Sequence, residues 1–354
     1  MKIGLIVPAN LKYSPYVKYY TEILCAEGAC FYSMVWDKAG INEEVDFRFD
    51  FASSDFDRKR IMLGHYLFSR KCRQFIRKEK IDHLIIFTIA PLYFLGSGFL
   101  KRFAGKMIID IRDDSPFRRR FPKILEKAAA ISDTVVVSSP YYSEWIRGDS
   151  FLCHNADLSL IEKYKEPFPR NAFTKPISIA YAGMMIEEQI NIKAIQALAN
   201  NEGFQLVYIG RDNEGKEKIK QYVKEHEIRN VSFIGEYKKE DIIDLYRENA
   251  NLVNILRENT LINRNALPNK LYEAVISGIP LVVYEHNTAI ANYVGKYGLG
   301  ILLNDQEDLE DQLDRKIREF DFDRYQAGRQ EFLNLVLDDY AIFRERIVRF
   351  ISEQ

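Results

Sequence analysis

The sequence predicts an α/β protein with two doubly wound, Rossmann-like domains, each built on a parallel sheet. Two observations lead to this prediction. Short apolar runs alternate with amphipathic, helix-like stretches in both halves of the chain. A polar segment with prolines at 167 and 169 separates the two halves. Because doubly wound sheets bind ligands at the carboxyl ends of their strands, we expect the two domains to face a cleft.

The first alternation predicts a domain over residues 1–160. Strand-like apolar runs lie at 2–7, 31–36, 83–88, 106–111 and 134–138. Helical patterns lie between them, at 16–27, 57–79, 121–130 and 141–147. This order of strands and helices indicates a parallel sheet covered by helices on both faces.

A linker is predicted over 161–176 and a second domain over 177–320. The strands of this domain are expected at 177–181, 205–209, 231–234, 252–255 and 281–284. Its helices are expected at 190–199, 214–226, 239–249 and 269–277. From 321 to 354, apolar side chains recur every three or four residues, which predicts C-terminal helices.

The composition excludes several classes of protein. The 354 residues carry a net charge of -1, so nucleic acid is not an expected partner. The four cysteines form no C-x-x-C pair and the five histidines are dispersed, so we expect free thiols and no metal site. The first apolar run is shorter than the core of a signal peptide, and no run reaches the roughly 20 apolar residues of a membrane-spanning helix. We therefore expect a cytoplasmic protein.

The most informative motif runs from Leu267 to Val283. It places Pro268 at the start of a helix, Gly278 at its end and a buried strand close behind. A helix amino terminus offers unpaired N–H groups to a phosphate, and Glu273, further along the helix, can accept two hydrogen bonds from a ribose diol. The motif predicts half of a nucleotide-sugar pocket.

Several segments, in this order and spacing, resemble the GT-B glycosyltransferases of the group 1 type. The sequence Ile131–Ser138 resembles the last strand of their acceptor domain, and His154-Asn155-Ala156-Asp157 resembles the H-N-x-x-D element at the domain crossover. Tyr181-Ala182-Gly183 resembles the first strand of the donor domain. Phe233–Tyr237, followed by Glu240-Asp241-Ile242, resembles the region that binds the base.

The resemblance implies an enzyme of bacterial surface polysaccharide synthesis. Its second domain would bind a nucleoside-diphosphate sugar, with UDP or GDP, and no other cofactor would be required. Its first domain would bind a glycan or lipid-linked acceptor. The final helix would cross back, so that residues 321–354 pack on the first domain.

Two departures from the family pattern concern charge. The retaining group 1 pattern often has two glutamates separated by seven residues, but here Asn265 precedes Glu273. The family often has Arg and Lys soon after the glycine that corresponds to Gly183, whereas residues 184–190 contain no cation. A diphosphate leaving group needs its charge neutralised, so other cations or a metal must serve, and the stereochemical course stays open. The candidate donor-site residues are Gly183, Arg211, Tyr237, Arg257, Arg264, Asn269, Lys270 and Glu273.

Two residues are candidates for catalysis. Asp113 follows a strand of the first domain and is a candidate general base for the acceptor hydroxyl. Asn265 is a candidate hydrogen-bonding partner of the donor sugar. The loop at 8–14 lacks G-x-G-x-x-G, which argues against a nicotinamide site, and is a candidate lining of the acceptor side.

Three functions remain open from the sequence. The leading hypothesis is a hexosyltransferase. The second is a nucleotide-sugar epimerase with Glu187, Glu188 and His286 as acid–base candidates, and the third is a catalytically weak GT-B subunit of a partner transferase. Basic and aromatic clusters in the first domain, such as 117–121, suit contact with an anionic membrane, which would place the protein at the inner face of the plasma membrane.

Overall fold

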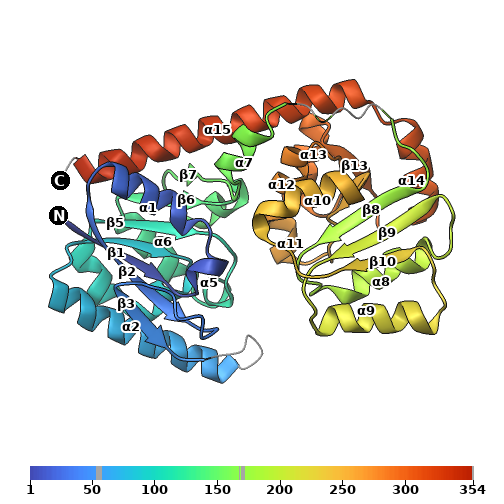
Figure 1. Cartoon of the computed structure of the whole chain (residues 1–354). Coiled ribbons are helices and arrows are strands. Elements are labelled where there is room, and N and C mark those ends of the chain that lie inside the picture. Colours follow the sequence, from blue (N-terminus) through green and yellow to red (C-terminus); the bar gives the residue numbers. More distant parts are fainter. Residues whose placement is uncertain (53–57, 167, 169–171, 353–354) are drawn as a thin grey trace. The chain divides into compact units, whose positions relative to one another are not determined.

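The computed structural model describes residues 1–52, 58–166, 168 and 172–352. The chain divides into two compact units, Met1–Asn155 with Asp338–Gln354, and Ala156–Leu337. In Figure 1 the first unit runs from blue to green and closes with the red end of the last helix. The predicted class, with two doubly wound parallel sheets, is confirmed.

A seven-stranded parallel sheet forms the centre of the first unit, in the order β3-β2-β1-β4-β5-β6-β7. The central strands are buried runs of Ile, Leu and Val, as expected where helices cover both faces. The strands are β1 (Lys2–Val7), β2 (Cys30–Asp37), β3 (Phe47–Asp50), β4 (His83–Phe87), β5 (Met107–Ile111), β6 (Thr134–Val137) and β7 (Phe151–Leu152).

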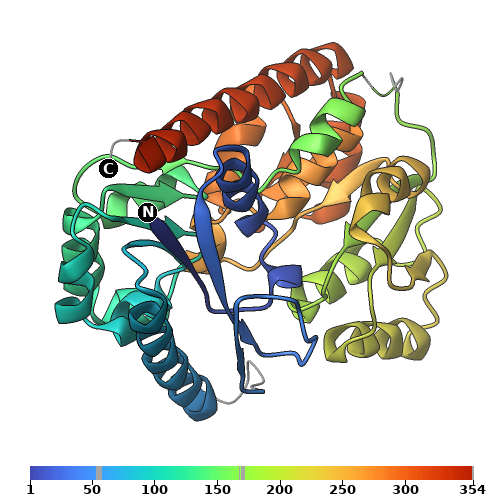
Figure 2. The ribbon, with the colours of Figure 1, turned by 60° about the vertical axis from the view of Figure 1, so that its left-hand side comes forward.

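Helices cover both faces of this sheet (Figures 1 and 2). Helix α1 and the end of α15 (Phe322–Ser352) pack on one face through Tyr20, Phe343 and Ile347. Helices α2, α3 and α6 pack on the other face. The helical segments are η1 (Leu11–Tyr13), α1 (Val17–Ala26), α2 (Arg58–Glu79), α3 (Ala90–Leu95), α4 (Ser97–Leu100), η2 (Lys101–Phe103), α5 (Pro116–Arg120), α6 (Pro122–Ile131) and η3 (Pro140–Trp145).

A six-stranded parallel sheet forms the centre of the second unit, in the order β10-β9-β8-β11-β12-β13. Helices α8, α9 and α14 pack on one face, and α10, α12 and α13 lie on the other. The strands are β8 (Ile177–Ala182), β9 (Phe204–Ile209), β10 (Val231–Ile234), β11 (Leu252–Asn254), β12 (Leu281–Tyr284) and β13 (Gly300–Leu303). The helical segments are α7 (Leu158–Lys163), α8 (Glu188–Ala197), α9 (Glu214–Glu225), η4 (Lys239–Asp241), α10 (Ile242–Asn249), α11 (Leu261–Asn265), α12 (Asn269–Ser277), α13 (Thr288–Tyr297), α14 (Leu309–Arg318) and α15 (Phe322–Ser352).

The unit boundary and the linker differ from the expectation. The first unit ends at Asn155 instead of 160, and the segment expected as a linker over 161–176 begins inside α7. Tyr164 explains the difference, because its hydroxyl donates to Asp244 Oδ2 at 2.8 Å and the Arg247 guanidinium lies over its ring. The segment therefore packs within the second unit, although residues 167 and 169–171 lie outside the described ones.

The tail also departs from the expectation that all of 321–354 packs on the first domain. It is one helix, α15, and its residues up to Leu337 belong to the second unit. Phe332 is buried there against Tyr272 and Tyr297, and only the part from Asp338 onward packs on the first sheet. The apolar spacing is continuous along the helix, so the sequence pattern gave no sign of this change of partner.

Candidate functional site

Helix α12 has the bounds that the motif predicts, Asn269–Ser277. Pro268 precedes it in an extended conformation, and Gly278 ends it in the left-handed region with φ of 76°. A Cβ at Gly278 would lie 2.7 Å from Cβ of Phe168, so both conformation and space favour glycine there. Buried apolar residues of α12, such as Leu271 and Val275, fix the helix against the sheet, which holds its amino terminus beside the ends of β8 and β11.

Lys270 lies in the first turn of α12 with its amine against an aromatic ring. The Nζ atom is 3.2 Å from the ring centre of Tyr181, the buried tyrosine near the end of β8. Burial and, after it, the Arg257 guanidinium lower the pKa of Lys270 to about 7, although the carboxylates of Glu273 and Glu187 act in the opposite direction. A lysine with this pKa can gain a full charge when an anion arrives at neutral pH.

Glu273 lies half-buried one turn along the helix and does not face bulk solvent. Burial raises its pKa, while the amines of Lys239 and Lys270 act in the opposite direction. After burial, the Glu273 carboxylate is the next cause of the raised pKa values of Tyr237 and Tyr246. Lys239, Lys270, Tyr237 and Tyr246 therefore lie near enough to the Glu273 carboxylate to interact with it electrostatically. The Tyr246 hydroxyl has no hydrogen-bond partner among the described residues.

A pocket of about 250 Å³ lies at the carboxyl ends of β8 and β11. It contains two of the predicted cations, Arg257 and Lys270, and one carboxylate, Glu187. Its lining is Tyr181, Met184, Ile186, Glu187, Ile255, Leu256, Arg257, Pro268 and Lys270. A small pocket with convergent cations and an apolar wall is typical of a site for an anionic small molecule.

Two glycines bring the ends of β8 and β9 into contact beside this pocket. Gly183 has φ of 118°, and a Cβ at Gly210 would lie 2.5 Å from the Gly183 carbonyl oxygen. A Cβ at Gly183 would lie 3.6 Å from Cε of Lys270. The close approach of these two backbones sets the position of the loop that follows Gly183. The loop itself contains no cation, but the Lys270 side chain lies beside Gly183, where the loop begins.

Glu187 organises the loops around the pocket, a role that the sequence did not indicate. Its carboxylate accepts hydrogen bonds from the backbone amide of Glu258 at 2.7 Å and from Nδ2 of the buried Asn263 at 3.0 Å. Its Oε1 atom lies 3.5 Å from Nε of Arg257. The loop after β8 and the loop after β11 are thus joined through one side chain. Partners 70 or more residues away leave no local pattern in the sequence.

The remaining predicted donor-site residues have different environments. Arg211 is exposed, and its guanidinium contacts the sulfur of Met184 at 3.1 Å, at the pocket edge. Arg264 is exposed and donates from Nε to Asn259 Oδ1 at 2.7 Å, so its guanidinium is engaged away from the pocket lining. Asn265, the last residue of α11, is half-buried, and Asn269 is exposed. The geometry brings together Gly183, Tyr237, Arg257, Lys270 and Glu273, and leaves the other candidates at the margin.

Two of the acid–base candidates for an epimerase are engaged in other contacts. The Glu188 carboxylate forms an ion pair with Lys218 of α9, with 3.3 Å between Oε1 and Nζ. His286 Nε2 lies 2.8 Å from the carbonyl oxygen of Arg257. Neither residue lines the pocket. Of the three acid–base candidates for an epimerase, the pocket contains Glu187.

In the first unit, the strand that precedes Asp113 ends in a buried ion pair. Asp110 is fully buried and accepts from the hydroxyl of Tyr20 at 2.6 Å and from Arg112 at 2.6 Å. Arg112 also donates to Asn155 Oδ1 at 2.9 Å, within the H-N-x-x-D element. Asp113 itself is exposed just beyond this cluster, at the carboxyl end of β5, where a ligand of a parallel sheet can reach it.

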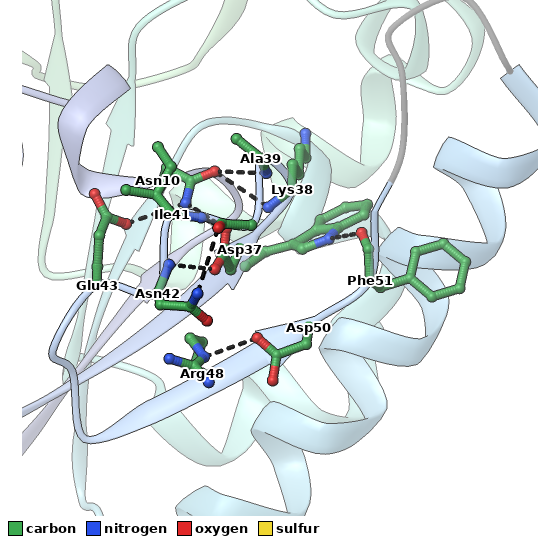
Figure 3. Close-up of polar contacts among 12 residues, drawn as sticks. Asn10, Asp37, Lys38, Ala39, Ile41, Asn42, Glu43, Arg48, Asp50 and Phe51 are labelled. Carbon is green, nitrogen blue, oxygen red and sulfur yellow. Dashed lines mark hydrogen bonds and ion pairs between the residues drawn. The ribbon is translucent and has the colours of Figure 1, made fainter.

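A polar network fixes the loops after β1 and β2 (Figure 3). Asn10 Nδ2 donates to Asp37 Oδ1 at 2.7 Å and to Glu43 at 3.2 Å, and its Oδ1 accepts from the backbone amides of Lys38 and Ala39. Burial alone would raise the pKa of Asp37, but hydrogen bonds from Asn10 and from the amides of residues 40–42 lower it to about 2. Several hydrogen bonds therefore join the loop at 8–14 to the loop after β2.

None of the described helices combines the length and apolar composition that crossing a membrane requires. Within the described ranges, no three His, Cys, Asp or Glu side chains gather as metal ligands would.

Comparisons with known proteins bear on the family of the second unit and on the fold. Residues 162–324 match the model of the family described as glycosyl transferases group 1. No curated protein matches the sequence significantly. Among solved structures, sucrose-phosphate synthase from Thermosynechococcus elongatus has a TM-score of 0.68 at 14% identity, covering 100% of both chains.

Two further structures have similar folds. The lipopolysaccharide outer core galactosyltransferase WaaB has a TM-score of 0.60 at 16% identity and covers 100% of this chain and 99% of its own. A putative UDP-N-acetylglucosamine 2-epimerase from Listeria monocytogenes has a TM-score of 0.55 at 12% identity, covering 100% of this chain and 97% of its own. At such low identity these likenesses establish the fold alone. These likenesses give the chain the GT-B fold, and the match over residues 162–324 makes the second unit a glycosyltransferase domain of group 1.

Proposed function

We propose that the protein transfers a hexose from a nucleoside-diphosphate donor, with UDP or GDP, to a hydroxyl of a glycan or lipid-linked acceptor in surface polysaccharide synthesis. The observation that carries the proposal is the pairing of Lys270 and Arg257 in the pocket at the start of α12, with the Glu273 carboxylate one turn further along the same helix and electrostatically coupled to Lys270. Two cations suit a diphosphate and the carboxylate suits a ribose.

The donor would bind with its charges distributed over these side chains. Lys270 and Arg257 would neutralise the diphosphate as the glycosidic bond to the leaving group breaks, which supplies the charge that the loop after Gly183 lacks. The Glu273 carboxylate would accept hydrogen bonds from both ribose hydroxyls, and the Tyr237 ring would stack on the base. Arg211, Arg264, Asn265 and Asn269 would complete the site when the loops close on the donor.

On the acceptor side, Asp113 would take the proton of the attacking hydroxyl. The hydrogen bonds that join the loop at 8–14 to the loop after β2 support this proposal, because a loop already ordered at the end of β1 can orient an acceptor at a lower entropy cost. We place the reaction in the cytoplasm at the inner face of the plasma membrane, where a nucleotide sugar and a lipid-linked acceptor would meet.

Titration calorimetry with UDP and with GDP tests the proposal. We expect one of them to bind with a dissociation constant below millimolar, and Glu273→Ala to weaken binding by about tenfold to a hundredfold, the cost of a charged hydrogen-bond acceptor. Glu248→Ala, an exposed glutamate of α10, is the matched control. Failure of both nucleotides to bind, or equal affinity in the two variants, contradicts the proposal.

A single incubation separates transfer from epimerisation. The donor sugar is mixed with the protein without acceptor and followed by NMR. A transferase leaves its stereochemistry unchanged, whereas inversion at one carbon would favour the epimerase.

A further inference from the structure

The first unit has a pocket of its own, away from the carboxyl ends of its strands and closer to the amino ends of β5 and β6. It lies between α6 and the α4–η2 segment and has a volume of about 450 Å³. Its lining is Ser97, Leu100, Lys101, Lys123, Ile124, Lys127, Ala128, Ala130 and Ile131. None of these residues belongs to the candidate catalytic or donor-binding groups, so the pocket needs an explanation of its own.

The pocket combines an apolar floor with a rim of lysines. Leu100 and Ala128 are buried, and Ile124 and Ile131 are half-buried beside them. This stripe follows one side of α6, as the spacing of four and three residues requires. An apolar depression of this size accepts a hydrocarbon chain, because each methylene buried there leaves water for an apolar surrounding.

The three lysines of the rim are exposed and unpaired. Lys101, Lys123 and Lys127 make no ion pair or side-chain hydrogen bond with any of the described residues, and no carboxylate is among the described residues that line the pocket. Lysines elsewhere on the surface do pair, as Lys218 and Lys220 do on α9. An unbalanced ring of positive charge around an apolar opening is complementary to a ligand with an anionic head and an apolar tail.

We propose that this pocket docks the protein on an anionic phospholipid membrane, with one acyl chain in the pocket and the phosphate headgroup among Lys101, Lys123 and Lys127. Phe121 is a further reason to expect a membrane, and not a soluble ligand, at this pocket. It is 51% exposed two residues before Lys123, and an exposed aromatic ring beside lysines inserts into the headgroup region of a bilayer. The inference rests on the proposed function and assigns its membrane contact to a defined site. Because its test uses no nucleotide-sugar donor, the membrane inference and the proposed transfer reaction can each fail independently of the other.

Vesicle sedimentation tests the inference on the full chain. We expect binding to phosphatidylglycerol vesicles, and weak or no binding to phosphatidylcholine vesicles. Since each basic residue near an anionic surface contributes on the order of 1 kcal/mol, Lys123→Ala with Lys127→Ala should weaken binding about thirtyfold. Lys193→Ala with Lys224→Ala removes the same charge from exposed positions of the second unit and should change binding less than threefold.

Two outcomes would overturn the inference. Equal loss in both double variants would mean that net charge alone attracts the protein. Complete competition by glycerol 3-phosphate, which has the headgroup chemistry but no chain, would mean that the pocket takes a soluble phosphate ester. Circular dichroism of each variant checks its fold, and the exposed positions of all four lysines favour intact folding.

Discussion

The amine of Lys270 lies 3.2 Å from the centre of the Tyr181 ring. The ring face stabilises the charged amine, whereas burial and Arg257 favour the neutral form. Burial and Arg257, opposed by the carboxylates of Glu273 and Glu187, leave the pKa of Lys270 at about 7, so the charge of the pocket changes within the physiological pH range. An ordinary surface lysine stays charged over this range.

The first prediction concerns the pH dependence of nucleotide binding. Below pH 7 Lys270 is protonated and attracts a diphosphate, and above pH 7 a proton must be taken up on binding. We therefore expect the affinity for UDP or GDP to fall between pH 7 and pH 9, by at most about tenfold per pH unit. Calorimetry in buffers of different ionisation enthalpy measures the proton uptake directly.

Lys270→Met should remove this pH dependence and weaken binding at pH 7. Lys224→Met, at an exposed position of α9, should preserve both the affinity and its slope. A wild-type affinity that is constant from pH 7 to pH 9 would show that Lys270 stays charged or does not contact the nucleotide.

The second prediction concerns Glu187. Glu187→Ala leaves the amide of Glu258 and the side chain of Asn263 without their acceptor, so we expect a loss of about 1–3 kcal/mol in the free energy of unfolding. Glu188→Ala removes only a surface pair with Lys218 and should cost less than about 1 kcal/mol. Thermal unfolding of the two neighbouring variants, followed by circular dichroism, makes the comparison, and equal midpoints would count against a linking role of Glu187.

The third prediction concerns the contact between Gly210 and Gly183. A Cβ at Gly210 would lie 2.5 Å from a backbone oxygen that cannot move without shifting β8, so Gly210→Ala should destabilise the second unit by about 1–3 kcal/mol. It should also weaken nucleotide binding, since the same contact positions the loop after Gly183. Gly98→Ala, where a Cβ meets nothing within 4 Å, is the control and should be neutral in both assays.

The fourth prediction concerns Asp37. Its pKa is about 2 in the folded chain against 3.8 as its ordinary value, so its ionised form contributes about 2 kcal/mol of stability above pH 4. The contribution should disappear as the pH falls through 2. Both tryptophans, Trp36 and Trp145, lie in the first unit, so their fluorescence reports its unfolding.

Asp37→Asn should lower that unfolding free energy at pH 5 and make little difference near pH 2. A constant gap between the two proteins from pH 5 to pH 2 would mean that the Asn10–Asp37 hydrogen bonds do not depend on the charge of Asp37.

The fifth prediction concerns the shared helix. Phe343 is fully buried between Tyr20 and the first sheet, so Phe343→Ala should destabilise the first unit by about 3–5 kcal/mol. Ile342→Ala, at an exposed position of the same helix, should cost less than about 1 kcal/mol. Tryptophan fluorescence again measures the unfolding, and similar losses in the two variants would contradict the packing.

The sequence was sufficient for the elements with strong local signals. Strand β1 and helix α12 have the expected bounds, because a buried apolar run and a proline–glycine pair mark them. Of the four edge strands, β10 was expected, at 231–234, but β3, β7 and β13 were not. Strand β3 has the alternation Phe47-Arg48-Phe49-Asp50 and β7 has two residues, and neither forms the apolar run of a central strand. Strand β13 begins at a glycine, which reads as a turn.

The sequence also located part of the site. The residues that follow β8, β10 and β11 are near one another because parallel strands end at the same edge, which the alternation predicts. The depressed pKa of Lys270 and the links of Glu187 depend on side chains that meet only in the folded chain. The expected helix at 141–147 is a 3-10 segment, Pro140–Trp145, because Pro140 begins a tight turn before Gly148. Position 57, the expected start of α2, lies outside the described residues.

One consequence of α15 concerns the order in which the nascent polypeptide acquires structure. The apolar surface of α1 and β1 is completed by Phe343, Ile347 and Phe350, which the ribosome adds nearly 200 residues after Asn155. During that delay the earlier unit has all its strands but an uncovered flank. Nascent chains should therefore attract chaperones that recognise exposed apolar surface until the second half has emerged, and protection of the first half from protease should arise only after its last helix has docked.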